Sequence, residues 1–150
     1  MKSDILSAMI SGIKSGFAQM AFIDVENLER IHQKIEYSTI IGIEIKAPLK
    51  GKMYFYFTKE LKELLIENIY DDALTELSAT KTDDCQLEMV NIIAGEFLSA
   101  LYQGKNTYQL GLPCIYFDEN CLELPDKNTI ITNFDAEGAY FKVIYCNMSK

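Results

Sequence analysis

The residues whose types could do chemistry gather in one stretch, DCQLEMVNIIAGEFLSALYQGKNTYQLGLP, from Asp84 to Pro113. Its apolar spacing predicts a long helix, then a Gly-containing turn and the start of a strand. At about 100° per residue, one side of that helix carries Asp84, Glu88, Asn91, Gly95 and Ser99. A carboxylate and a carboxamide one turn apart, beside a glycine and a serine, indicate a docking surface with chemistry rather than an ordinary solvated face.

The opposite side of the same helix is apolar and predicts a core face, made of Met89, Val90, Ile93, Phe97, Ala100 and Leu101. We expect the helix to begin near Asp83 or Asp84 and to end around Tyr102, where Gly104 follows. Asp84 is therefore expected to be its N-cap rather than a catalytic group. Pro113 cannot donate to a strand ladder, so it is expected at a sheet edge, a bulge or a strand end.

The rest of the chain predicts the elements that position this helix. Helices are expected from about Asp4 to Phe22, capped by Ser3 or Asp4, and over Lys59–Tyr70, capped by Thr58. Strands are expected over Thr39–Lys46, Lys52–Thr58, Thr107–Phe117, Thr129–Phe134 and Tyr140–Tyr145, with a hairpin turn at Asp135, Glu137 and Gly138. Ile23–Ser38 predicts a short edge strand or irregular piece, and the polar run Asp71–Asp83 a loop. This order predicts one α+β domain over residues 1–150, with an antiparallel sheet.

The chain also resembles itself. A shift of eighty residues superimposes the first helix on the central one and aligns identical residues, among them Met9 with Met89 and Phe17 with Phe97. Strands that end in a hairpin follow both helices. We therefore expect a duplicated unit of one helix plus strands. At the interesting positions the first copy has Ala8 for Glu88 and Ser11 for Asn91, so only the second copy would carry chemistry.

Composition excludes several function classes. The net charge of −8 argues against nucleic acid or an anionic membrane as partner. The four cysteines form no CxxC pair and His32 is the single histidine, which argues against zinc or iron–sulfur sites and fits a reducing, cytoplasmic location. Most of the cysteines are expected to be small buried side chains. No apolar run of 18 residues occurs. Tyr54 and Tyr56 alternate with Phe55 and Phe57, so we expect one pair in the core and the other on a solvated face.

Taken as a pattern, the central stretch is Asp84-x3-Glu88-x2-Asn91-x21-Pro113. It resembles the signature of the CheC, CheX and FliY family of chemotaxis phosphatases, and NIIAGEFLSAL resembles the Asn-x-Ile-Ala-Gly segment of that family. The resemblance extends from about Thr39 to the end of the chain. Because the first half lacks the Glu-x2-Asn element, the chain looks like the single-site CheX type. Glu96, which follows Ala-Gly, departs from the small or basic residues usual there.

The resemblance implies the CheC-like fold, in which two long helices pack on an antiparallel sheet with internal pseudo-symmetry. It also implies a phosphatase for a phosphorylated CheY-like receiver domain, whose own Mg²⁺ and lysine hold the phosphoryl group, so that no cofactor of this chain is expected. Asn91 would orient the attacking water, Glu88 would pair with the receiver's lysine, and Gly95 would let the partner backbone approach.

Two other readings remain open. The chain could be a binding module of the same fold that docks a receiver or a flagellar-switch-like partner without hydrolysis, a reading prompted by Glu96. A small-molecule-binding domain is a lesser option. A homodimer is expected on family grounds and from the aromatic strand around Tyr54 and Tyr56.

Overall fold

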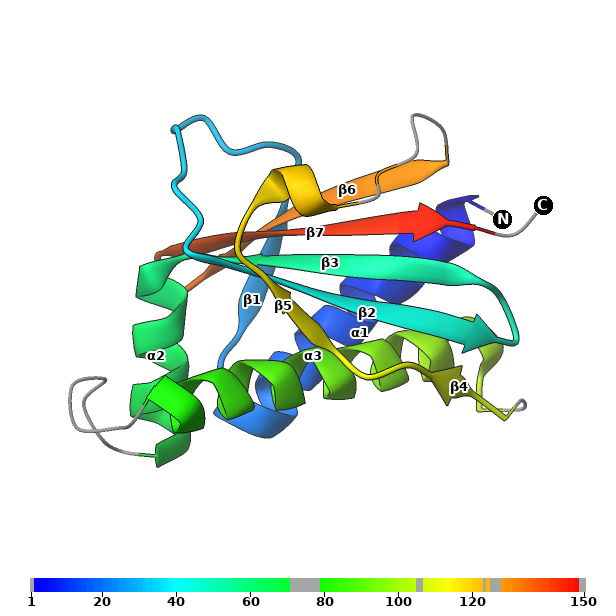
Figure 1. The fold of residues 1–150 in the computed structure, drawn as a ribbon, viewed down its shortest axis with the longest axis horizontal. Helices are drawn as coiled ribbons and strands as arrows, with labels where there is room; N and C mark the ends of the chain where they lie inside the picture. The colour runs from blue at the N-terminus through cyan, green and yellow to red at the C-terminus, as the bar shows by residue number, and fades with distance from the viewer. Residues whose placement is uncertain (1, 71–78, 105–106, 123, 125–127, 149–150) are drawn as a thin grey trace.

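Seven strands form one sheet, and two long helices lie against one of its faces (Figure 1). The computed structural model describes residues 2–70, 79–104, 107–122, 124 and 128–148. In chain order the elements are α1 (Lys2–Ala21), β1 (Val25–Leu28), β2 (Thr39–Ala47), β3 (Gly51–Phe57), α2 (Lys59–Tyr70), α3 (Ala79–Tyr102), β4 (Gln109–Leu110), β5 (Cys114–Tyr116), the 3₁₀ turn η2 (Glu119–Cys121), β6 (Thr129–Ala136) and β7 (Ala139–Asn147).

The sheet is built from two interlocked halves. Its order is β1-β6-β7-β3-β2-β4, with β5 also paired to β2, and every pair is antiparallel. The hairpin β2–β3 of the first half meets the hairpin β6–β7 of the second half along β3 and β7. Each half then adds a strand to the hairpin of the other, because β1 pairs with β6 and β5 pairs with β2. The predicted α+β fold with a duplicated unit is confirmed.

The core lies between the sheet and the helix pair. Phe17 of α1 stacks on Phe141 of β7 with ring centroids 4.9 Å apart, and Phe97 of α3 contacts the ring of Tyr145. The helices approach closely at Gly12, where an added Cβ would lie 2.7 Å from the backbone nitrogen of Phe97. Burial of these large apolar side chains fixes α3 against the sheet.

Several local predictions are confirmed, and one cap is wrong. Thr58 Oγ1 accepts from the backbone N–H of Leu61 at 3.2 Å, and Asp135 Oδ1 accepts from the N–H of Gly138 at 2.7 Å in the final hairpin. The helix α1 already includes Lys2, so Ser3 and Asp4 lie inside its first turn and neither is the N-cap. No helix in the described ranges combines the length and apolarity that a membrane crossing needs.

The central helix begins earlier than its sequence predicts. It starts at Ala79, so the expected loop is wrong over residues 79–83, while residues 71–78 lie outside the described part of the chain. The reason is visible on its buried side, where Thr82 and Gln86 occupy core-facing positions. Because these residues are polar, the apolar spacing in the sequence does not extend to the N-terminal start of the helix.

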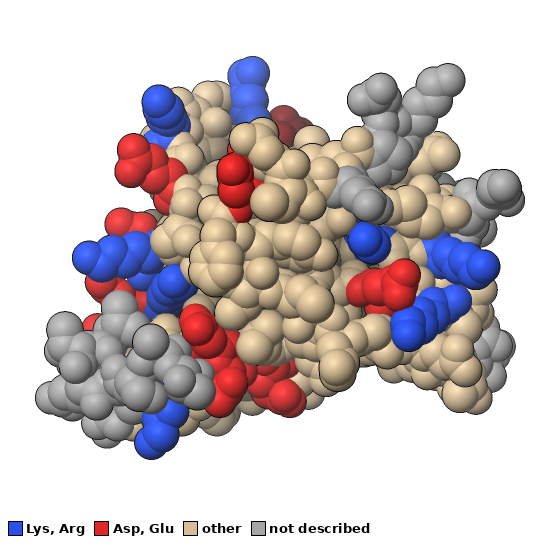
Figure 2. Space-filling model, viewed as in Figure 1, with Lys and Arg blue, Asp and Glu red and all other residues tan. Residues whose placement is uncertain are grey.

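The outer face of the sheet is covered, so the expectation that one aromatic pair of β3 is solvated is wrong, and the pair on this face is Tyr54 and Tyr56. Both side chains are 1% exposed. Tyr37 packs edge-on against Tyr56 and Tyr116 against Tyr54, with centroids 5.3 and 5.9 Å apart. The ammonium group of Lys142 lies 4.2 Å from the Tyr56 ring centre. In Figure 2 uncharged residues fill the middle of this side of the molecule, and charged groups surround them.

The segment around Pro113 agrees with its prediction in part. The expected strand Thr107–Phe117 is split into β4 and β5, and Pro113 stands directly before β5 at the sheet edge. All four cysteines are free thiols. Cys85 and Cys146 are buried as expected, whereas Cys114 and Cys121 are exposed.

Candidate functional site

The candidate site is the exposed side of α3, here called the α3 face and defined as Asp84, Glu88, Asn91, Gly95 and Ser99. Asp84, Glu88, Asn91 and Ser99 are exposed, and Gly95 is half-buried. With a rise of about 1.5 Å per residue, Glu88 and Asn91 lie about one turn apart along the axis. Their side chains therefore present a carboxylate and a carboxamide together to solvent.

Gly95 has no structural partner that explains it. A Cβ added there would meet nothing within 4 Å, in contrast to Gly12, where the neighbouring helix leaves no room. A glycine inside a helix costs about 1 kcal/mol relative to alanine. The packing of the described residues therefore does not require a glycine at this position.

Glu96, the residue that departs from the family pattern, points toward α1. Its carboxylate accepts from Ser15 Oγ at 3.2 Å and from Gln19 Nε2 at 3.1 Å, and Gln19 Nε2 also lies 2.7 Å from Ser15 Oγ. The side chain is thus engaged in the α1–α3 contact beside the α3 face. This contact orients α3 and leaves the α3 face to Glu88 and Asn91.

Asp84 lies in the second turn of α3, so its predicted role as N-cap is wrong. Burial, and then Cys85 and the Asp84 carboxylate, raise the pKa of Tyr70 at the end of α2. Asp84 extends the negative charge of the α3 face one turn beyond Glu88.

Pro113 lies on the segment between β4 and β5. It is half-buried on the sheet edge next to β5, which pairs with β2. Two residues before it, the Gly111 N–H donates to the carbonyl of Glu44 at 2.8 Å. The proline therefore shapes the end of an edge strand and contributes no chemical group to the site.

The matching positions on α1 have a different setting. Ala8, the counterpart of Glu88, is buried and lines a groove with Ala100 and Leu101 of α3. Ser11, the counterpart of Asn91, is exposed. Neither position on α1 carries a carboxylate or a carboxamide, so the first half lacks the side chains for a second site of the same kind.

The arrangement suits hydrolysis only with a partner. The Asn91 carboxamide can accept a hydrogen bond from water and donate one to an anion while it stays neutral. Glu88 can bind a cation. His32 is exposed in the loop after β1, and among the described residues no group of three or more His, Cys, Asp or Glu side chains could hold a metal ion.

No protein-family model matches the chain, and no curated protein matches it. Solved structures do. A chemotaxis protein CheX from Desulfovibrio desulfuricans is similar with a TM-score of 0.76 and 18% identity, over 95% of this chain and 98% of that one. CheX from Vibrio vulnificus gives 0.75 and 16%, over 95% and 97% of the two chains. A CheX–CheY–BeF3–Mg²⁺ complex from Borrelia burgdorferi gives 0.70 and 14%, over 94% and 96%. The chain therefore has the CheC-like fold, as its sequence predicts.

Proposed function

We propose that this protein is a phosphatase that hydrolyses the aspartyl phosphate of a phosphorylated CheY-like response regulator. The observation that supports it most is the joint exposure of Glu88 and Asn91 on α3, beside a glycine that the fold does not need. The chain shares its fold with a CheX that is solved in complex with CheY, BeF3 and Mg²⁺. This similarity supports a CheY-like receiver as the partner.

In the proposed reaction the receiver supplies the acyl phosphate, a Mg²⁺ ion and a lysine. Asn91 accepts a hydrogen bond from a water molecule and holds it in line with the phosphorus–oxygen bond. The water oxygen attacks phosphorus, the bond to the receiver's aspartate breaks, and inorganic phosphate and a free carboxylate result. Glu88 pairs with the receiver's lysine and sets the position of α3. No covalent intermediate and no cofactor of this chain take part.

The test follows the decay of a phosphorylated receiver with and without this protein. Wild-type protein should accelerate decay, and Asn91→Ala should lose about a hundredfold of that acceleration, as when one preorganised donor is removed from an active site. Ser11→Ala is the matched control, because Ser11 is the exposed counterpart of Asn91 on α1 and should leave the rate unchanged. Equal rates for wild type and Asn91→Ala would remove the catalytic claim.

The alternative is a binding module that docks a receiver or a flagellar-switch-like partner without hydrolysis. Tight receiver binding that is insensitive to Asn91→Ala, with an unchanged phosphate lifetime, would favour it. The unusual Glu96 no longer supports this alternative, because its carboxylate is engaged with α1.

A homodimer in the cytoplasm completes the proposal, on the basis of the family resemblance. Tyr54 and Tyr56 lend it no support, since the chain itself covers them. Light scattering at micromolar concentration should give the mass of two chains. A single species of one-chain mass would contradict the dimer.

A further inference from the structure

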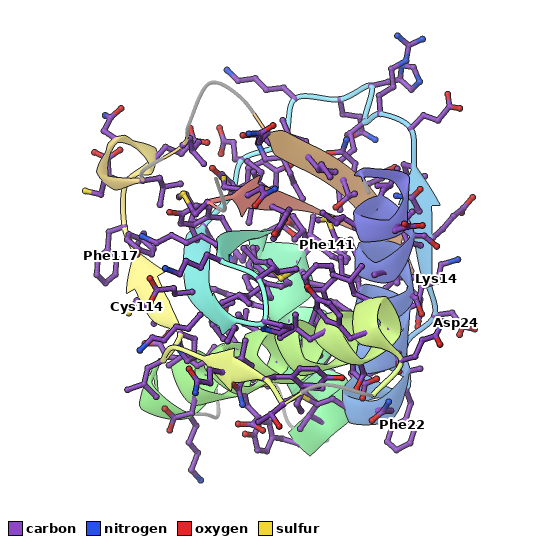
Figure 3. The ribbon with its side chains drawn as sticks, turned by 90° about the vertical axis from the view of Figure 1, so that its right-hand side faces the viewer. Lys14, Phe22, Asp24, Cys114, Phe117 and Phe141 are labelled. Atoms are coloured by element: carbon purple, nitrogen blue, oxygen red, sulfur yellow. The ribbon has the colours of Figure 1, made fainter. Side chains whose placement is uncertain are left out.

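Phe22 is an aromatic side chain that the fold leaves outside. Six of the eight phenylalanines are at most 2% exposed, whereas Phe22 is 83% and Phe117 is 95% exposed. Phe22 directly follows the last residue of α1 and projects from the lower corner of the molecule in Figure 3. An isolated exposed apolar residue is ordinary, so its position must decide whether it has a role.

The backbone at Phe22 is also unusual. Its φ is +56°, in the left-handed region where a bulky side chain is disfavoured and glycine is the usual helix-ending residue. The Phe22 N–H donates to the carbonyl of Ala18 at 3.2 Å, and the Ile23 N–H to the carbonyl of Phe17 at 3.3 Å. Glycine would make the same bonds without exposing a ring, so the fold itself does not require phenylalanine here.

Phe22 lies where the ends of three helix segments meet. Gly12 faces Phe97 and Gly16 faces Ile93, so α1 runs antiparallel to α3 and its end lies toward the N-terminal half of that helix. Asn68 near the end of α2 donates to the carbonyl of Ala21 at 3.0 Å. Figure 1 shows the C-terminal ends of α1 and α2 beside the first turns of α3.

The same corner adjoins the acidic end of the α3 face. Asp84 lies one turn before Glu88, in the N-terminal half of α3 toward which the end of α1 points. Asp24, two residues after Phe22, is exposed as well. The corner therefore combines one projecting aromatic ring with carboxylates around it.

From these observations we infer that Phe22 is the apolar anchor by which this protein docks a receiver domain, with the ring seated beside the receiver's active-site lysine. The choice of a receiver rests on the proposed function. A second copy of this chain is disfavoured as occupant, because a two-fold contact at this corner would bring Asp24, Asp84 and Glu88 of both copies together. The lysine that the proposed function assigns to the receiver would instead bring a positive charge to these carboxylates. Phe22 is a positioning residue and touches no reacting atom.

The experiment measures binding of fluorescently labelled CheY-like receivers from the same genome, activated with beryllium fluoride and Mg²⁺. Phe22→Ala should raise Kd about 30-fold, the size of a hot-spot truncation. Phe117→Ala is the matched control, since Phe117 is equally exposed but lies on the opposite side of the molecule in Figure 3, and it should leave Kd unchanged. In phosphate decay, Phe22→Ala should raise KM and spare kcat.

Phe22→Gly keeps the test independent of folding. Because glycine favours the left-handed conformation, this variant should melt at the same or a higher temperature than wild type and still bind weakly. A Kd equal to wild type for Phe22→Ala or Phe22→Gly would overturn the inference. So would a Phe22-dependent dimer in light scattering, or wild-type protein that binds none of the activated receivers.

The outcomes also separate this inference from the phosphatase proposal. Phe22-dependent binding without faster phosphate decay would retain the anchor and remove the catalysis. Faster decay that Phe22→Ala does not change would retain the catalysis and remove the anchor.

Discussion

At the scale of single residues, the site is chemically modest. Glu88 and Asn91 are solvated side chains on a helix, and neither a strong base nor a metal ligand set accompanies them in the described part of the chain. Such groups become effective when a partner displaces water around them, because hydrogen bonds to a developing charge are stronger in a dry site. The chemistry would thus be completed only in the complex.

Gly95 gives a prediction at the same scale. Gly95→Ala should raise the free energy of unfolding by up to about 1 kcal/mol in urea denaturation, because the new methyl group meets nothing and the helix becomes stiffer. Gly95→Leu should also fold and should weaken receiver binding by blocking the close approach. Gly12→Ala is the opposite control and should destabilise the protein, since its Cβ would collide with the backbone of α3. Loss of stability in Gly95→Ala would show that the glycine is structural.

At the scale of elements, α3 positions the site through two different contacts. Its apolar side packs against the sheet, and its Glu96 joins it to Ser15 and Gln19 of α1. These hydrogen bonds lie beside the α3 face, so they set the rotation of the helix without covering Glu88 or Asn91. Structure and the proposed chemistry would therefore be divided between neighbouring residues of one helix.

This division predicts that two variants behave in opposite ways. Glu96→Ala should lower the free energy of unfolding by about 0.5–1.5 kcal/mol, the usual worth of a side-chain hydrogen bond, and leave the rate of phosphate decay unchanged. Asn91→Ala should leave the free energy of unfolding unchanged and lower the rate enhancement about a hundredfold. Both quantities can be measured on the same preparations. A slow Glu96→Ala variant of wild-type stability would assign Glu96 to the partner surface.

The sequence predicted elements wherever the local pattern decides the structure. The apolar spacing of α1 and α2, the hydroxyl of Thr58 and the turn at Gly138 all act within a few residues. The start of α3 was missed because its buried positions hold Thr82 and Gln86. The burial of Tyr56 could not be predicted, since its cover includes Tyr37 from a distant segment.

The candidate site divides in the same way. Glu88 and Asn91 could be found from their spacing on one helix, since that spacing alone places them on a common face. The left-handed backbone at Phe22 could not, because no glycine near it signals that turn. Its exposure does agree with the helical pattern, since at about 100° per residue Phe22 lies about 180° around the helix from the buried Ile13.

At the scale of the whole molecule, burial divides the four thiols into two pairs. Cys114 and Cys121 are exposed, while Cys85 and Cys146 lie in the two apolar clusters on either side of the sheet. Burial raises the pKa of Cys85 to about 11, and burial also raises the pKa of Cys146. The reactive thiolate form of both buried residues is thereby suppressed.

Iodoacetamide at pH 8 should therefore label Cys114 and Cys121 rapidly, and Cys85 and Cys146 only after unfolding, as peptide mass mapping can show.

The raised pKa of Cys85 also links the stability of the protein to pH. Between pH 9, the ordinary value, and about 11, the unfolded chain loses the Cys85 proton before the folded one does, so the free energy of unfolding should fall. Cys85→Ala should show a shallower fall across this window. Rapid native labelling of Cys85 would contradict its burial.

The exchange of outer strands between the two halves has a consequence for how the protein can be divided. Because β1 completes the second hairpin and β5 completes the first, a fragment that ends after α2 lacks one border of its own sheet, and so does the fragment that begins with α3. Each fragment would expose an unpaired strand edge, and the strand that pairs with this edge belongs to the other fragment. The two halves are therefore expected to fold only together. A chain divided between α2 and α3 would regain its fold when the two fragments bind each other, so refolding would detect their association.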